Sequence, residues 1–203
     1  LYKLSKSKSI INPLQKPYAA QPNDFSNGNT SYQGNHSDWQ RLYGTIGATK
    51  GKWFYELKIT AIASYNNRVG WDSIDHINPG ADNYYSGLTV AGNGELRGGI
   101  LDYSGYDPDA VQMTAAHSGG NLSFTTSDIL GMALDRDNNT FSLYKNGNLE
   151  VDAYSFASAS NCSVLLSKGY FVGPSVNFQS VSSDTQTGEF NFGNGTFGTS
   201  LVS

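Results

Sequence analysis

The chain is poor in the residues that build most metal and disulfide sites. It has one cysteine, Cys162, and three histidines among 203 residues. A single cysteine excludes a disulfide within the chain, and the sequence contains neither a His-x-x-x-His nor a Cys-x-x-Cys spacing. We therefore expect a fold that is held together by its apolar core, with no metal and no cofactor.

Charge is scarce as well. Charged residues make up 15% of the chain, well below the roughly 25% of ordinary soluble domains. The formal net charge is −4, from 13 basic and 17 acidic residues. Residues 1–20 hold four lysines and no acid, so the remainder carries 9 basic against 17 acidic residues. A net-acidic body argues against nucleic acid as a partner, because neutralising phosphates needs a basic surface.

Long apolar runs are missing too. No stretch approaches the roughly 20 apolar residues of a membrane span, and the opening residues lack the apolar block of a signal peptide, so we expect neither. Three of the six prolines are Pro13, Pro17 and Pro22, and proline favours extended backbone. We interpret residues 1–22 as an extended N-terminal tether or anchor and residues 23–203 as a single domain.

Short alternating segments separated by turn residues dominate the rest of the chain. In GKWFYELKI, residues 51–59, every second position is apolar: Trp53, Tyr55, Leu57 and Ile59. A two-residue period predicts a β-strand. These four residues would form its core face, and Glu56 and Lys58 would lie on the more solvent-exposed face. Several such strands with evenly spaced turns predict an antiparallel sandwich or barrel.

The clearest predicted hairpin spans residues 128–147. Apolar residues alternate on both sides of a polar turn, and the hairpin ends at Asn146-Gly147. This dipeptide suits a type I′ turn because both central residues need positive φ. Two further strands are predicted at residues 170–178 and 188–193.

Tyrosines gather in stretches rich in Asn, Asp and Gly that are typical of loops. Tyrosine offers a large, stiff contact surface with a polar tip, and Ser, Gly and Asn add adaptable hydrogen bonds, a composition that binding loops use. The other interpretation is that the rings pack the loops onto the sandwich. A guanidinium beside tyrosines can stack or pair with a ligand carboxylate, and a salt bridge to an aspartate of the chain is the alternative. The candidate ligand-binding residues are Tyr65, Asn66, Asn67, Arg68, Tyr84, Tyr85, Tyr103 and Tyr106.

Asp135, Asp137 and Asn139 imitate the start of a calcium-binding loop. Such a loop needs Gly at its sixth and Glu at its twelfth position, where this chain has Thr140 and Asn146. Because Asp and Asn are common turn formers, we predict a polar hairpin turn and no metal site.

No motif marks a catalytic centre. The G-x-S-x-G context of a serine nucleophile does not occur, and we predict that the chain is not an enzyme. The enzyme hypothesis that we retain as an alternative is a glycan-processing enzyme. It would use a carboxylate pair drawn from Asp102, Asp107 and Asp109.

The order of the segments resembles the SPRY domain, the core of the B30.2 module. The segments are GKWFYELKI, RVGWDSIDH (68–76), DILGMALDRDNNTFSLYKNG (128–147), GYFVGPSVNF (169–178) and GEFNFG (188–193). They are similar to the family's Gly-Lys-Trp/His-Tyr-Tyr-Glu strand, its Ile-Gly-Trp strand, its hairpin closing on Lys-Asn-Gly, its Tyr-Phe-Pro strand and its final Asn-Phe-Gly. The chain departs from the family where Val172 and Gly173 separate Phe171 from Pro174.

The resemblance implies an all-β fold, a bent antiparallel two-sheet β-sandwich of the concanavalin-like jelly-roll type. It also implies a non-enzymatic module that binds proteins through loops at one end. The scarcity of cysteine and charge, with abundant Asn, Gly, Ser and Thr, further resembles SPRY-like domains in structural proteins of tailed bacteriophages.

We therefore predict a virion structural or recognition protein of a bacteriophage, of the tail-fibre or capsid-decoration type, at the surface of the particle. Residues 1–22 would bind other virion proteins, and the loops would bind a host-surface protein or glycan, or a neighbouring capsid subunit. Self-association stays open. The alternative is a cytoplasmic SPRY adaptor that recognises a protein target.

Overall fold

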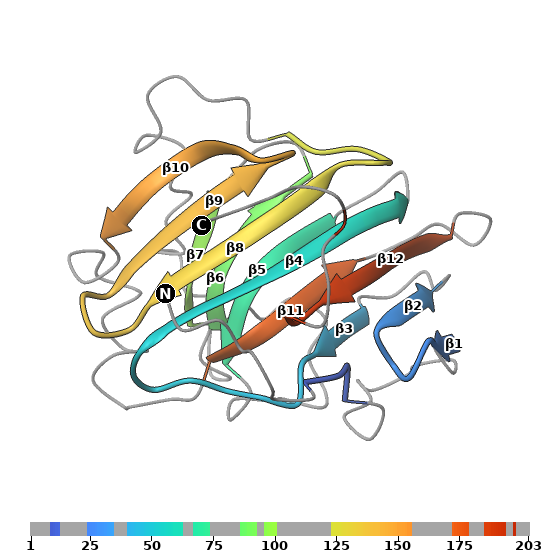
Figure 1. The fold of residues 1–203 in the computed structure, drawn as a ribbon, viewed down its shortest axis with the longest axis horizontal. Helices are drawn as coiled ribbons and strands as arrows, with labels where there is room; N and C mark the ends of the chain where they lie inside the picture. Colours follow the sequence, from blue (N-terminus) through green and yellow to red (C-terminus); the bar gives the residue numbers. More distant parts are fainter. Residues whose placement is uncertain are drawn as a thin grey trace.

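The computed structural model describes residues 9–12, 24–34, 40–62, 67–73, 86–92, 96–100, 123–155, 172–178, 185–193 and 197. These residues form twelve β-strands and no helix. The strands make two antiparallel sheets, of seven and five strands, and Figure 1 shows the seven-stranded sheet stacked in front of the other. The predicted fold class, an all-β antiparallel sandwich of two sheets, is confirmed.

Each sheet is built around a central strand. In the seven-stranded sheet the order is β1 (Asp24–Ser26), β2 (Ser31–Gly34), β12 (Gln186–Asn191), β4 (Lys52–Ala61), β8 (Ile129–Asp135), β9 (Thr140–Lys145) and β10 (Asn148–Ser155). In the five-stranded sheet the order is β3 (Gln40–Tyr43), β11 (Val172–Phe178), β5 (Asn67–Ser73), β6 (Ser86–Ala91) and β7 (Leu96–Ile100). Strands β4 and β5 therefore lie at the middle of their layers.

Strand β4 shows how alternation decides which face is buried. Three of its predicted core residues are fully buried: Tyr55, Leu57 and Ile59. Trp53, the fourth, is only partly buried and packs at the margin of the core. The prediction of a solvent-exposed outer face is wrong for Glu56. This residue is 4% exposed, and its Oε2 accepts a hydrogen bond from Asn191 Nδ2 at 2.7 Å.

The predicted hairpin is confirmed as β8 and β9, which pair from Leu130 with Lys145 to Asp135 with Thr140. Asn146 and Gly147 follow with φ angles of 50° and 87°. These are the positive values that the central residues of a type I′ turn need, so the dipeptide acts as predicted.

Aromatic side chains join the two layers. Tyr55 of β4 meets Trp71 of β5 edge-on, with ring centroids 5.0 Å apart, and the Tyr55 hydroxyl donates to Gly70 O at 2.5 Å. A Cβ at Gly70 would lie 2.0 Å from Leu88 O. The close approach of β5 and β6 therefore requires glycine at this position.

Residues 9–12 pack onto both sheets, although they belong to the predicted tether. Ile11 is 1% exposed and belongs to the core. Its N–H donates to Asn29 O, between β1 and β2, at 2.8 Å, and Asn12 N donates to Tyr43 O of β3 at 2.7 Å. Residues 9–12 of the predicted tether or anchor therefore pack on the domain, and the rest of residues 1–22 lies outside the described part.

Candidate functional site

Two predicted ligand-binding residues, Asn67 and Arg68, begin strand β5 instead of lying in a loop. Arg68 is opposite Asn177 of β11 and Ala91 of β6. This pairing on both sides satisfies the backbone and outweighs the loop-like sequence. Both side chains are 3% exposed and take part in interactions within the chain, so neither is presented at the surface.

The six other predicted residues lie outside the described residues, and their part in binding stays a prediction. They are Tyr65, Asn66, Tyr84, Tyr85, Tyr103 and Tyr106. The strands next to them in sequence end on opposite sides of the five-stranded sheet. Tyr65 and Asn66 precede Asn67, the first residue of β5, whereas Tyr84 and Tyr85 precede Ser86, whose β-strand lies antiparallel to β5. The described strand ends that these residues adjoin in sequence therefore lie at two different ends of the sandwich.

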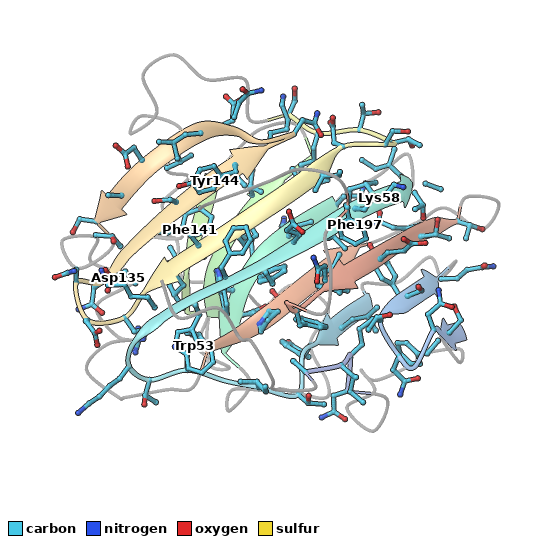
Figure 2. All side chains as sticks on the ribbon, in the orientation of Figure 1. Trp53, Lys58, Asp135, Phe141, Tyr144 and Phe197 are labelled. Carbon is cyan, nitrogen blue, oxygen red and sulfur yellow. The ribbon has the colours of Figure 1, made fainter. Side chains whose placement is uncertain are left out.

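The β4–β8 ladder runs from Lys52 opposite Asp135 to Lys58 opposite Ile129. We call its two ends the Arg136 end (residues 50–53 and 134–137) and the Asn146 end (residues 123–129 and 145–147). Figure 2 shows Trp53 and Asp135 toward one end of these strands and Lys58 toward the other.

The Arg136 end coincides with one end of the five-stranded sheet. Val172 at the start of β11 pairs with Ser73, the last residue of β5, and also bridges to Ala48. Ala48 precedes Lys52 by four residues, and Figure 1 shows β4 and β11 starting on the same side. Ser86 and Ile100, which pair with each other, therefore also lie at the Arg136 end of the sandwich.

Asp135 at this end holds the turn together. Its Oδ1 accepts from the backbone N–H groups of Asp137 and Asn138, both at 3.0 Å, and its Oδ2 lies 2.9 Å from Lys52 Nζ. Burial opposes ionisation of Asp135, but the Lys52 pair and the turn amides outweigh it and hold the pKa of Asp135 well below its ordinary value. The hydrogen bond to Asp135 likewise raises the pKa of Lys52.

Arg136 is the residue at this end that the sequence did not single out. Its backbone N–H donates to Gly51 O at 2.9 Å, and the residue is 8% exposed. Its Nε lies beneath the surface without an acceptor, and burial lowers the pKa of Arg136. A charged residue in a sequence such as Asp-Arg-Asp is typical of a solvated turn, so the sequence carried no signal of burial.

The Asn146 end is closed by hydrogen bonds. Asn146 Oδ1 accepts from Ile129 N at 2.8 Å, and Asn146 Nδ2 donates to Asp128 Oδ1 at 2.7 Å. The other oxygen of Asp128 accepts from Thr125 N at 2.8 Å. Lys145 Nζ donates to Ser123 O at 3.0 Å, so side chains and backbone at this end bind each other.

Two buried polar residues of strand β5, Arg68 and Asp72, lie on the face of the five-stranded sheet that is turned away from the core. Val69 and Trp71 of β5 face the core, so Arg68 and Asp72 alternate onto the opposite face. Both are buried, and both have interactions within the chain. Neither side chain is therefore available at the surface as a separate binding group.

Within the described residues there is no group of three or more His, Cys, Asp or Glu side chains that could hold a metal. The catalytic candidates Asp102, Asp107 and Asp109 lie outside those residues. No helix in the described part of the chain is long and apolar enough to cross a membrane.

Comparison with known proteins identifies the fold. No family model and no curated protein matches the sequence. Among the 224 solved chains that match by structure is the crystal structure of the SPRY domain of human HERC1. The two share a TM-score of 0.59 and 17% sequence identity, over 89% of this chain and 96% of that one. The chain thus has the fold of a SPRY domain, as the order of its sequence motifs predicted.

Proposed function

We propose that this chain is a non-enzymatic protein-recognition domain. The observation that carries the proposal is the SPRY-like fold, which matches a solved SPRY domain along most of both chains. The order of five sequence motifs supports the same conclusion independently. Loops carried by a rigid sandwich are a common site of recognition, and the tyrosine-rich segments of this chain have the composition of binding loops.

The binding face of this proposal is the end of the sandwich where β6 begins and β7 ends. Tyr84 and Tyr85 directly precede Ser86, and Tyr103 follows Ile100 by three residues. Because Ser86 and Ile100 pair, these tyrosines are attached to neighbouring strand ends.

In its finer form, the proposal is that the chain is a structural or recognition protein of a bacteriophage virion. Its support is compositional: one cysteine, 15% charged residues and 23 glycines. Other virion proteins would bind through the N-terminal segment, using residues other than the packed 9–12. A host-surface protein or glycan, or a neighbouring capsid subunit, would bind the loops.

Site-specific photo-crosslinking tests the proposal. The photoreactive residue benzoyl-phenylalanine would replace Tyr84 or Tyr103, with Asp152, exposed on edge strand β10, as the matched control position. We expect one protein to be crosslinked from the tyrosine positions and not from Asp152, and its purified form to bind the unmodified chain. Equal crosslinking from all three positions would contradict recognition by these loops.

The identity and location of the crosslinked partner decide between the finer forms. A partner from the virion or the host surface, together with detection of the chain in purified particles by mass spectrometry, supports the virion role. A cytoplasmic partner supports the adaptor instead. Turnover of a polysaccharide that is abolished by Asp102→Asn would overturn the non-enzymatic proposal.

A further inference from the structure

Arg136 lies between two carboxylates in sequence and pairs with neither. Asp135 is bound to Lys52 Nζ at 2.9 Å and to the amides of its own turn. Asp137 Oδ1 accepts from Gly51 N at 2.9 Å. Both neighbouring acids are therefore engaged with other groups of the Arg136 end.

The strand alternation explains this separation. The hydrogen bond from Arg136 N to Gly51 O continues the β4–β8 ladder one pair beyond Lys52 and Asp135. Successive residues of a ladder point to opposite faces. Asp135 therefore shares the outer face with Lys52, whereas Arg136 shares the inner face with Leu134, which belongs to the core.

Arg136 is largely buried, and the small part of it that remains exposed does not include Nε. The residue is 8% exposed, and Nε is the one nitrogen of this side chain that is both buried and without an acceptor. A donor taken out of water without a new acceptor is unfavourable. Burial accordingly lowers the pKa of Arg136, with no carboxylate opposing the shift.

The surroundings of Arg136 suit a protein partner. Trp53 is half-buried at the same end, and its Nε1 donates to Lys50 O at 2.6 Å, which holds the indole in place. Lys50 is exposed and adds positive charge. Arginine and tryptophan are the side chains most often found to dominate binding energy in protein interfaces. The strand ends next to Tyr84 and Tyr103 lie at this end as well.

We propose that the Arg136 end is a docking site for an acidic side chain of the partner protein, whose carboxylate pairs with the Arg136 guanidinium. This inference rests on the proposed recognition function. A carboxylate offers two oxygens in the geometry that a guanidinium binds best, and it supplies the negative charge that the neighbouring aspartates do not. A neutral amide in its place would leave the desolvated cation uncompensated.

The first experiment needs no partner protein. N-acetyl-glutamate amide would be titrated into the isotope-labelled chain while the Nε–H resonance of Arg136, assigned by its loss in Arg136→Met, is followed by NMR. N-acetyl-glutamine amide is the neutral control probe. We expect a saturable shift with the glutamate probe and none with the glutamine probe. No shift, or the same shift with both probes, overturns the proposal.

A matched pair of variants extends the test to the crosslinked partner. Arg136→Met and Lys52→Met remove the same charge at the same end but on opposite faces. Loss of a central arginine contact weakens binding by about 30-fold or more, so we expect this for Arg136→Met and less than about a twofold change for Lys52→Met. Equal affinities of the two variants would overturn the inference and leave the recognition function intact.

The two proposals therefore fail separately. If no protein is crosslinked, the recognition function falls, while the glutamate titration still decides whether Arg136 binds a carboxylate. Arg136→Lys serves if Arg136→Met does not fold: it keeps the charge but loses the two-pronged geometry, and we expect weakened partner binding with the native thermal midpoint retained. Undiminished binding by Arg136→Lys would argue against a paired guanidinium.

Discussion

The two ends of the β4–β8 ladder complete their hydrogen bonding in different ways. At the Asn146 end, Asn146 and Asp128 bind each other and the adjacent backbone. At the Arg136 end, Asp135 is equally well bound, but Arg136 Nε has no acceptor. One end thus satisfies its polar groups with its own residues, and the other keeps one buried donor without an acceptor.

The largest expected effect is a loss of stability, and we expect it to differ between core residues at the two ends of the ladder. Leu130 is fully buried near the Asn146 end, so Leu130→Ala is expected to lower the free energy of unfolding by about 3 kcal/mol. Trp53, half-buried at the Arg136 end, leaves a less enclosed gap, and we expect Trp53→Ala to cost about half as much. Urea unfolding of both variants checks this, and a larger loss for Trp53→Ala would show that the Arg136 end is the better packed.

Substitution of a single residue, Asn146, is expected to disrupt the hydrogen bonding of the Asn146 end. Asn146→Ala removes two side-chain hydrogen bonds and places alanine at a φ of 50°, so we expect a loss of about 2 kcal/mol. Asn146→Gly tolerates that φ and isolates the hydrogen bonds, with about half the loss. The free energies of unfolding from denaturant titration provide the comparison. Equal losses in both variants would mean that backbone conformation contributes nothing.

The ion pair at the Arg136 end gives a smaller effect that depends on pH. Because the folded pKa of Asp135 is lowered, its stabilisation is present above the unfolded pKa of about 4 and is lost as pH falls toward the folded pKa. We expect Asp135→Asn to cost less than about 1 kcal/mol at neutral pH, since Lys52 is well exposed. Unfolding at a series of pH values should show the gap between wild type and variant closing in acid, and a constant gap would contradict the assignment.

The smallest expected effect is that of Arg136→Met on stability. The variant loses no hydrogen bond of Nε, since Nε makes none, and it removes a desolvated charge. We expect the free energy of unfolding to change by less than about 0.5 kcal/mol or to rise. A loss of several kcal/mol in thermal or denaturant unfolding would show that Arg136 has a structural role, and the contrast between the two ends would disappear.

The sequence was informative where local pattern and packing agree. Alternation in β4 predicted the burial of Tyr55, Leu57 and Ile59, and Asn146-Gly147 predicted its turn, because period and turn chemistry are local properties. It was wrong for Glu56, and it did not indicate the burial of Ile11, because burial at both positions depends on which other segments the fold places next to them. The two-residue alternation of a strand assigns each residue to one face of the sheet, but it does not show which other segments cover that face.

The candidate site was harder to predict for the same reason. Asn67 and Arg68 have the composition of a loop, yet pairing with β11 and β6 makes them part of a strand. Arg136 lies in an Asp-Arg-Asp turn, and only the register with Gly51 and Lys52 places it on the core side. Alternation predicts such a position once the last pair of a ladder is known, and a single sequence does not define that pair.

The attachment of residues 9–12 to both sheets has a mechanical consequence. Ile11 is hydrogen-bonded beside the seven-stranded sheet through Asn29, whereas Asn12 and Ile10 are hydrogen-bonded to Tyr43 and Thr45 at the five-stranded sheet. Tension applied through the preceding residues would reach both layers at once instead of peeling one strand from an edge. A chain fastened in this way would transmit a pull to the whole sandwich, and Ile11, buried in the core, would resist being drawn out.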